Sequence, residues 1–185
     1  MSKKYPITVS SWTLGDQCSF EERVKAAKEA GFEGIGLRAE TYVDALNEGL
    51  FDADILAILE KYDMKATVSI VGAYTDAACE EAEPDPAYSY LDWQDVSVLR
   101  DSGHVEICNH SYDMHNLEGR RGVGQLEGES YEDYRKIFLK DTTKLQTLCD
   151  EHCGFQPNVY TYPFGITCES ASRLVKNMGF EASLG

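Results

Sequence analysis

The chain has 185 residues, of which 43% are hydrophobic, and this is enough apolar surface for one folded domain with a core of ordinary size. Its 32 acidic and 17 basic residues give a formal net charge of −15, which argues against nucleic acid and anionic membrane surfaces as partners. No apolar run reaches the ~20 residues of a membrane-spanning helix, and no signal peptide follows the first lysines. We therefore expect a cytoplasmic protein with reduced, free cysteines.

Strand-like apolar runs alternate with amphipathic helical runs along the whole chain, which predicts βα units and a parallel sheet. The first helix is expected to begin after Ser19, a good N-cap residue, and to end at Ala30, before Gly31 in the left-handed conformation. Gly103, Gly154 and Gly179 follow three later helical stretches in the same way. The predicted strands are 6–12, 34–40, 65–72, 104–110, 158–163 and 180–184.

Two segments, 73–90 and 116–130, interrupt this alternation and are predicted to be long loops. Such loops often carry binding residues, although plain insertion is an equally common origin. Six strands are fewer than the roughly eight of a closed barrel. We predict an α/β fold, a partial or distorted (β/α) barrel with about six parallel strands. The chain is then either a fragment or partial barrel, or a homo-oligomer that closes the open sheet edge.

Two histidines lie where the fourth predicted strand ends, in the segment Asn-His-Ser-Tyr-Asp-Met-His at 109–115. Parallel barrels place their chemistry at the carboxyl ends of strands, and imidazole is a favoured Zn²⁺ ligand. His110 and His115 are therefore candidate ligands of zinc or another divalent metal. Asp113 is a candidate acceptor that would orient one imidazole. On this pattern alone, unconnected loop histidines are an equally good interpretation.

From about residue 65 to 185 the chain resembles the polysaccharide deacetylases that act on chitooligosaccharides and peptidoglycan. The resemblance rests on Lys65-Ala66-Thr67, Val105-Glu106-Ile107-Cys108-Asn109-His110-Ser111 and Thr161-Tyr162-Pro163-Phe164-Gly165. It implies a hydrolase that removes acetyl groups from N-acetylated sugars, with a metal held by one Asp and two His. His110 and His115 match the histidines, although the commoner spacing would place Met114 at the second position. The Tyr162 backbone N–H would help to bind the oxyanion.

Other parts of the deacetylase pattern are missing. The family takes its general base and its third metal ligand from an Asp-Asp pair, which this sequence lacks, and its later Leu-x-His motif would lie beyond Gly185. Residues 7–64 resemble xylose-isomerase-like sugar phosphate isomerase/epimerase barrels instead, in Ser11-Trp12-Thr13-Leu14-Gly15 and Leu37-Arg38-Ala39-Glu40. We therefore interpret the chain as one barrel-type domain, 1–185, with an isomerase-like part at 1–64 and a deacetylase-like part at 65–185.

Three functions follow from these resemblances, each with a carbohydrate as the partner. The first is an active metal-dependent deacetylase in which Glu40 or Asp44 replaces the missing carboxylate. The second is a catalytically inactive chimeric or truncated barrel that binds metal or sugar weakly. The third is a sugar phosphate isomerase-like protein. Chemistry favours the second, because losing a ligand, the base and the acid together leaves little catalysis.

Overall fold

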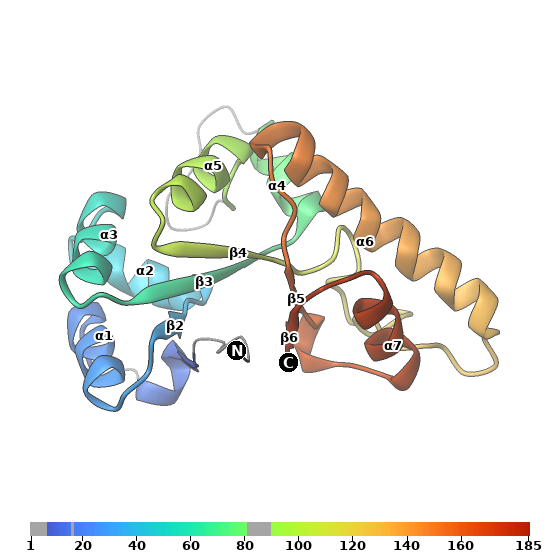
Figure 1. The fold of residues 1–185 in the computed structure, drawn as a ribbon, viewed down its shortest axis with the longest axis horizontal. Coiled ribbons are helices and arrows are strands. Elements are labelled where there is room, and N and C mark those ends of the chain that lie inside the picture. Colours follow the sequence, from blue (N-terminus) through green and yellow to red (C-terminus); the bar gives the residue numbers. More distant parts are fainter. Residues whose placement is uncertain (1–6, 16, 81–89) are drawn as a thin grey trace, which may run out of the picture. The chain divides into compact units, whose positions relative to one another are not determined.

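The computed structural model describes residues 7–15, 17–80 and 90–185 (Figure 1). Six strands form one sheet in the order β1-β2-β3-β4-β5-β6, and every pairing with a described register is parallel. The predicted class, an α/β partial (β/α) barrel, is confirmed. The elements are β1 (Thr8–Ser10), η1 (Ser11–Leu14), α1 (Phe20–Glu29), β2 (Gly34–Gly36), α2 (Ala39–Asn47), α3 (Asp52–Lys61), β3 (Lys65–Ile70), α4 (Gly72–Ala78), α5 (Trp93–Asp101), β4 (Val105–Asn109), α6 (Tyr131–Cys153), β5 (Val159–Thr161), η2 (Pro163–Gly165), α7 (Glu169–Asn177) and β6 (Ala182–Leu184).

The chain divides into two compact units. Among the described residues, the first unit contains those up to Val68 together with Val98–Glu106, and the second contains the others. In the first unit, α1 begins with a capping box in which the Glu22 amide donates to the Ser19 hydroxyl and the Ser19 amide donates to the Glu22 carboxylate. This confirms the predicted start of the helix.

Close strand packing in the first unit requires a glycine at position 34. Gly34 pairs with Thr8 on one side and with Lys65 on the other. A Cβ atom at this position would lie 2.9 Å from the Thr8 methyl carbon and 3.0 Å from the Lys65 carbonyl oxygen. Only glycine therefore lets β2 lie between its two neighbours without displacing them.

The second unit is built on the long helix α6, drawn in orange in Figure 1, which packs on α7. The Ser130 hydroxyl accepts from the Asp133 amide at the start of α6, and Gly154 ends the helix in the left-handed conformation (φ 68°). The predicted helix 131–153 is thus confirmed at both ends. Its apolar side contributes to a buried core formed mainly by Tyr134, Phe138, Tyr160, Leu174 and Val175.

All six predicted strands are present but shorter, and two helices were not predicted. The expected strand 34–40 ends at Gly36, and Glu40 lies in the first turn of α2. The first part of the expected loop 73–90 belongs to α4, while residues 81–89 lie outside the described part of the chain. The loop 116–130 has no helix or strand, as predicted. Gly31, Gly103, Gly154 and Gly179 all have positive φ, which confirms the predicted helix ends.

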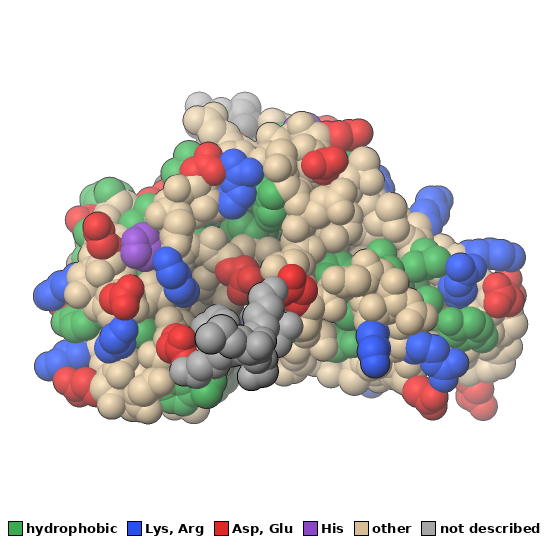
Figure 2. Space-filling model, in the orientation of Figure 1, with side chains coloured by type: hydrophobic (Ala, Val, Ile, Leu, Met, Phe, Trp, Pro, Cys, Tyr) green, Lys and Arg blue, Asp and Glu red, His purple; other side chains and the backbone are tan. Residues whose placement is uncertain are grey.

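The surface carries both signs of charge. Figure 2 shows basic side chains scattered among acidic ones on the face that it displays. The helices of the described residues are all too short or too polar to cross a membrane. None of the six cysteines, all of which lie in the described ranges, forms a disulfide, and Cys149 and Cys153 are buried on α6 as packing residues.

Candidate functional site

His110 lies directly after β4 in the second unit, and its ring is oriented by the next strand. Its backbone amide donates to the Ile70 carbonyl (3.0 Å), and its Nδ1 lies 2.8 Å from the Thr161 carbonyl oxygen. A carbonyl can only accept, so this contact assigns the proton to Nδ1 and leaves the lone pair on Nε2. The Thr161 carbonyl therefore has the orienting role that we predicted for Asp113. Such a contact is typical of metal-binding histidines.

The backbone between the two histidines turns sharply at Ser111, which has a φ of 74°. A positive φ is strained for a serine, so the surrounding contacts must hold it. The Ser111 amide donates to the Asn109 side-chain oxygen (2.9 Å), and the Ser111 hydroxyl accepts from the Met114 amide (3.1 Å). Asn109 is itself fully buried and donates to the Gln146 side-chain oxygen (3.2 Å). The turn is thus anchored to α6.

Asp141 on α6 provides a second anchor for the same turn, and the sequence analysis did not identify it. One carboxylate oxygen accepts from the Tyr112 amide and the other from the Asp113 amide, both at 2.8 Å. Burial raises the pKa of Asp141 above its ordinary 3.8, while the two amide contacts act in the opposite direction. Asp141 therefore fixes the segment that leads to His115.

His115 lies beside His110, with their ring centroids 4.9 Å apart. Imidazoles that share a tetrahedral zinc at the usual Zn–N distance of about 2.0–2.1 Å have centroids about 5 Å apart. Met114 is only 5% exposed and packs into the core. The longer spacing is therefore accommodated because Met114 turns inward and His115 takes the position beside His110.

The pKa values of both histidines favour the neutral, ligating form. Burial lowers the pKa of His110 from its ordinary 6.5 to about 4; the Thr161 contact opposes this shift and the neighbouring His115 adds to it. Burial also lowers the pKa of His115. Metal ligation requires neutral imidazole, so the pair would not need to lose protons at neutral pH. The two rings fit as two ligands of a divalent metal.

Aromatic rings surround His115. Phe164 stacks on it with centroids 4.2 Å apart, and Tyr74 meets it edge-on at 5.9 Å while donating a hydrogen bond to its carbonyl (3.1 Å). Tyr90 stacks on Tyr74 at 4.5 Å. Phe164 and Tyr90 are 45% and 55% exposed, so part of this aromatic surface is open to a ligand.

Comparison with known proteins identifies the family. The sequence model described as polysaccharide deacetylase matches residues 41–183, a range that includes both histidines and ends within β6. The chain belongs to the polysaccharide deacetylase family. This match begins before residue 65, where the predicted resemblance began. No curated protein matches the chain.

Solved structures with the same fold include deacetylases and a pseudoenzyme. The deacetylase domain of BpsB from Bordetella bronchiseptica is 16% identical, with a TM-score of 0.60, over 96% of this chain and 70% of that one. A de-N-acetylase from Aggregatibacter actinomycetemcomitans is 17% identical, with a TM-score of 0.60, over 99% and 80%. A CE4 family pseudoenzyme from Bacillus anthracis is 14% identical, with a TM-score of 0.50, over 82% and 41%.

The backbone amide that the polysaccharide deacetylase family implies as an oxyanion donor is engaged elsewhere. Tyr162 is buried at the end of β5, and its N–H donates to the Leu184 carbonyl of β6 at 2.8 Å. An oxyanion would have to replace this sheet hydrogen bond. The oxyanion role of Tyr162 stays a prediction, and it would require the amide to exchange its Leu184 partner for the oxyanion.

In the described part of the chain, the carboxylate that a polysaccharide deacetylase needs is not found beside the histidines. Among the described residues, no group of three or more His, Cys, Asp or Glu side chains could hold a metal ion. Asp44 belongs to the first unit and pairs with Arg23 at 3.4 Å. Glu40 lies on α2 in that unit, and its side chain is not among those described. The described residues thus bring together two imidazoles and no acid.

The remaining two histidines have structural surroundings, as predicted. His104 Nδ1 lies 3.4 Å from the Met64 carbonyl, and His152 stacks on Trp93 with ring centroids 4.8 Å apart. His152 lies in the last turn of α6. Neither is needed to explain the site.

Proposed function

We propose that this polysaccharide deacetylase family member binds an N-acetylated carbohydrate beside a divalent metal, zinc or a similar ion, and does not hydrolyse the acetyl group. The observation that carries the proposal is the oriented pair, His110 on the Thr161 carbonyl and His115 beside it. The exposed rings of Phe164 and Tyr90 suit the flat apolar face of a sugar.

The residues of this chain can perform only part of a deacetylation. His110 and His115 would hold the metal, which when bound supplies Lewis-acid polarisation of the acetyl carbonyl. A hydrolysis also needs a carboxylate to take a proton from water, and the described residues place none with the pair. The Tyr162 amide is engaged by Leu184. Binding without turnover follows from this set of groups.

Active hydrolysis is the second candidate, because the family and two similar structures are named for deacetylation. It would use Glu40 as the replacement carboxylate. The pseudoenzyme offers a parallel for the first candidate, and one of its mutants is described as having restored enzymatic activity. The sugar phosphate isomerase alternative has less support, because the structural likeness to deacetylases spans nearly the whole chain.

An acetate-release assay separates these candidates. The chain is loaded with Zn²⁺ and incubated with an N-acetylglucosamine oligomer, and acetate and bound oligomer are both measured. We expect the oligomer to bind, and we expect this binding to require Zn²⁺ or to become weaker in the Phe164→Ala variant. We expect acetate to be released no faster than without protein. Acetate release that disappears in Glu40→Gln would contradict inactivity and establish the second candidate. Absence of both binding and release would refute the proposal.

We also propose that the protein works in a reducing compartment and pairs with a second copy of itself. The six free cysteines support a reducing compartment such as the cytoplasm. Among the described residues, β1 and β6 are the outer strands of the sheet, and an outer strand offers an edge for pairing with a second chain.

A further inference from the structure

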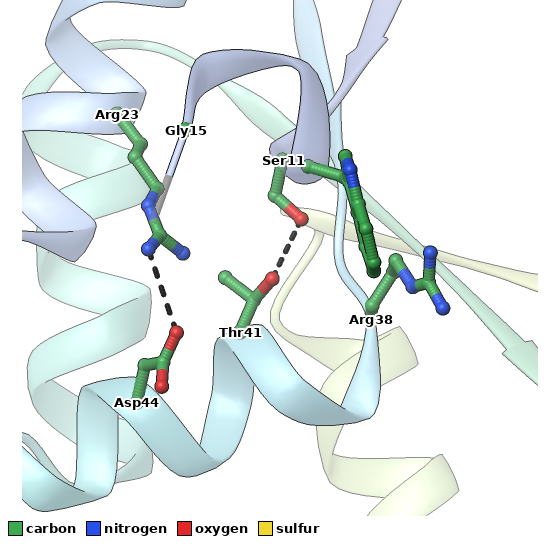
Figure 3. Close-up of a pocket in the computed structure, with 7 residues that line it drawn as sticks. Ser11, Gly15, Arg23, Arg38, Thr41 and Asp44 are labelled. Carbon is green, nitrogen blue, oxygen red and sulfur yellow. Dashed lines mark hydrogen bonds and ion pairs between the residues drawn. The ribbon is translucent and has the colours of Figure 1, made fainter. Parts of the chain in front are cut away.

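A pocket with both polar and apolar lining lies within the first unit and does not include the histidine pair. Its volume is about 360 Å³, within the range of small-molecule sites. Figure 3 shows residues that line it, contributed by η1, α1, α2 and the segment before α2. The lining residues are Ser11, Trp12, Gly15, Arg23, Arg38, Thr41 and Asp44. Ser11, Trp12 and Arg38 follow the carboxyl ends of β1 and β2, the edge at which parallel barrels place their ligands.

Arg23 is buried in this pocket but incompletely paired. The residue is 4% exposed, and its Nε has no hydrogen-bond partner among the described residues. Its Nη2 lies 3.4 Å from the Asp44 carboxylate, longer than the about 2.7–2.9 Å of a strong charge-assisted bond. Figure 3 shows the two side chains pointing toward each other from α1 and α2. A buried guanidinium with an unmet donor indicates that a further acceptor is accommodated here.

A second guanidinium and an indole lie on the same pocket. Arg38 Cζ is 4.4 Å from the centre of the Trp12 ring, so the guanidinium covers one ring face. Trp12 is 67% exposed, which leaves much of the indole open to a ligand. An exposed indole and a guanidinium together suit a ligand with an apolar ring face and an anionic group.

Two hydroxyl groups complete the lining. Ser11 and Thr41 are buried, and their oxygens lie 2.7 Å apart (Figure 3). Each hydroxyl has further hydrogen-bonding capacity that a ligand hydroxyl could use. The pocket is also larger than an inorganic anion needs. These features together favour a polyhydroxylated ligand over a bare anion.

We propose that this pocket binds an anionic sugar, whose carboxylate or phosphate group is held by Arg23 and whose ring contacts Trp12, the indole on which Arg38 stacks. The whole chain has a net charge of −15 and repels anions in general, so the attraction must come from these two guanidinium groups. The Asp44 carboxylate competes with an anionic ligand for the Arg23 guanidinium. Replacing Asp44 by the neutral amide Asn should therefore increase the affinity for the ligand. The proposal does not depend on the metal or on deacetylation.

The test is a fluorescence titration of the full chain, because Trp12 is exposed whereas Trp93 is buried. The probes are glucose 6-phosphate, glucuronate, glucose and inorganic phosphate. We expect at least one of the two anionic sugars to bind at least about tenfold more tightly than glucose and than inorganic phosphate. A factor of this size is about the effect of one good charge-assisted hydrogen bond. The probe that binds identifies the anionic group as a phosphate or a carboxylate.

Variants assign the binding to the pocket. Arg38→Gln is expected to weaken binding at least about tenfold, and Asp44→Asn to tighten it about threefold or more, since it removes a like charge near the anion. Arg135→Gln, an exposed arginine of the second unit, is the matched control and should change binding less than twofold. Equal binding of glucose or inorganic phosphate overturns the proposal, as do an unchanged Arg38→Gln variant and the absence of binding by both anionic sugars.

Discussion

Asp141 offers a direct test of how the turn between the two histidines is held. Its carboxylate accepts from the amides of Tyr112 and Asp113, each at 2.8 Å, from a position on α6. Asp141→Asn keeps the shape of the side chain and one oxygen acceptor. The second acceptor becomes an NH2 group that faces a backbone N–H, so one hydrogen bond is lost and two donors oppose each other.

The expected loss of stability follows from two opposing contributions. A hydrogen bond to a charged group contributes about 1.5–3 kcal/mol, and the substitution removes one and weakens the other. The neutral amide also relieves the burial cost that raises the pKa of Asp141. We therefore expect the free energy of unfolding to fall by about 1–2 kcal/mol at pH 7. Because the folded-state pKa of Asp141 is raised, the native residue's contribution increases as the pH falls through that pKa.

Urea unfolding followed by circular dichroism measures this loss. Asp150→Asn is the matched control, because Asp150 is exposed on the same helix. The control should change the free energy of unfolding by less than about 0.5 kcal/mol. The affinity for Zn²⁺ should also fall in Asp141→Asn, because the turn leads to His115. A loss no larger than that of the control would refute the assigned role of Asp141.

Two further predictions concern the loop 116–130. Glu129→Gln should reduce the free energy of unfolding by about 3 kcal/mol, because it leaves the largely buried Arg120 guanidinium without its carboxylate. Glu132→Gln is the control: its ion pair is exposed, so the free energy of unfolding should fall by less than about 0.5 kcal/mol. The hydrogen bond from Arg120 lowers the pKa of Glu129. The pair's contribution to the free energy of unfolding is therefore complete above about pH 4.5 and is lost as the pH falls through the folded-state pKa. A stability difference between the native chain and Glu129→Gln that does not change with pH would contradict this. Gly122→Ala should lower the melting temperature more than Gly119→Ala: both glycines have positive φ, but only the Cβ at 122 would approach a carbonyl oxygen, at 2.8 Å. Equal shifts would exclude the steric explanation.

Local sequence signals predicted most of the fold. The capping residues Ser19 and Ser130 and the left-handed Gly31 and Gly154 fixed the helix ends, because these signals act within one or two turns. The helix at 39–47 was missed because Leu37-Arg38-Ala39-Glu40, after the three-residue strand β2, alternates apolar and charged residues as a strand does. The helix at 72–78 was missed because the acidic, proline-containing stretch after it dominated the composition of the segment.

The histidine pair could be predicted, but the groups that support it could not. His110 and His115 are close in the sequence and follow a strand, so their spacing carried the signal. The Thr161 carbonyl is a backbone group and has no side-chain signature, although it replaces Asp113 as the orienting acceptor. Asp141 lies in an amphipathic helix where an acidic residue is ordinarily a solvated one. The engagement of the Tyr162 amide depends on the pairing of β5 with β6, which only the structure provides.

Calorimetric titration with Zn²⁺ tests the central claim that His110 and His115 form one divalent-metal site. We expect about one Zn²⁺ per chain, and at least tenfold weaker binding in both His110→Ala and His115→Ala, since each removes one of two nitrogen ligands. His152→Ala removes an exposed histidine outside the pair and should bind as the unmodified chain does. Equal affinities in all four proteins, or no binding by the unmodified chain, would contradict the account.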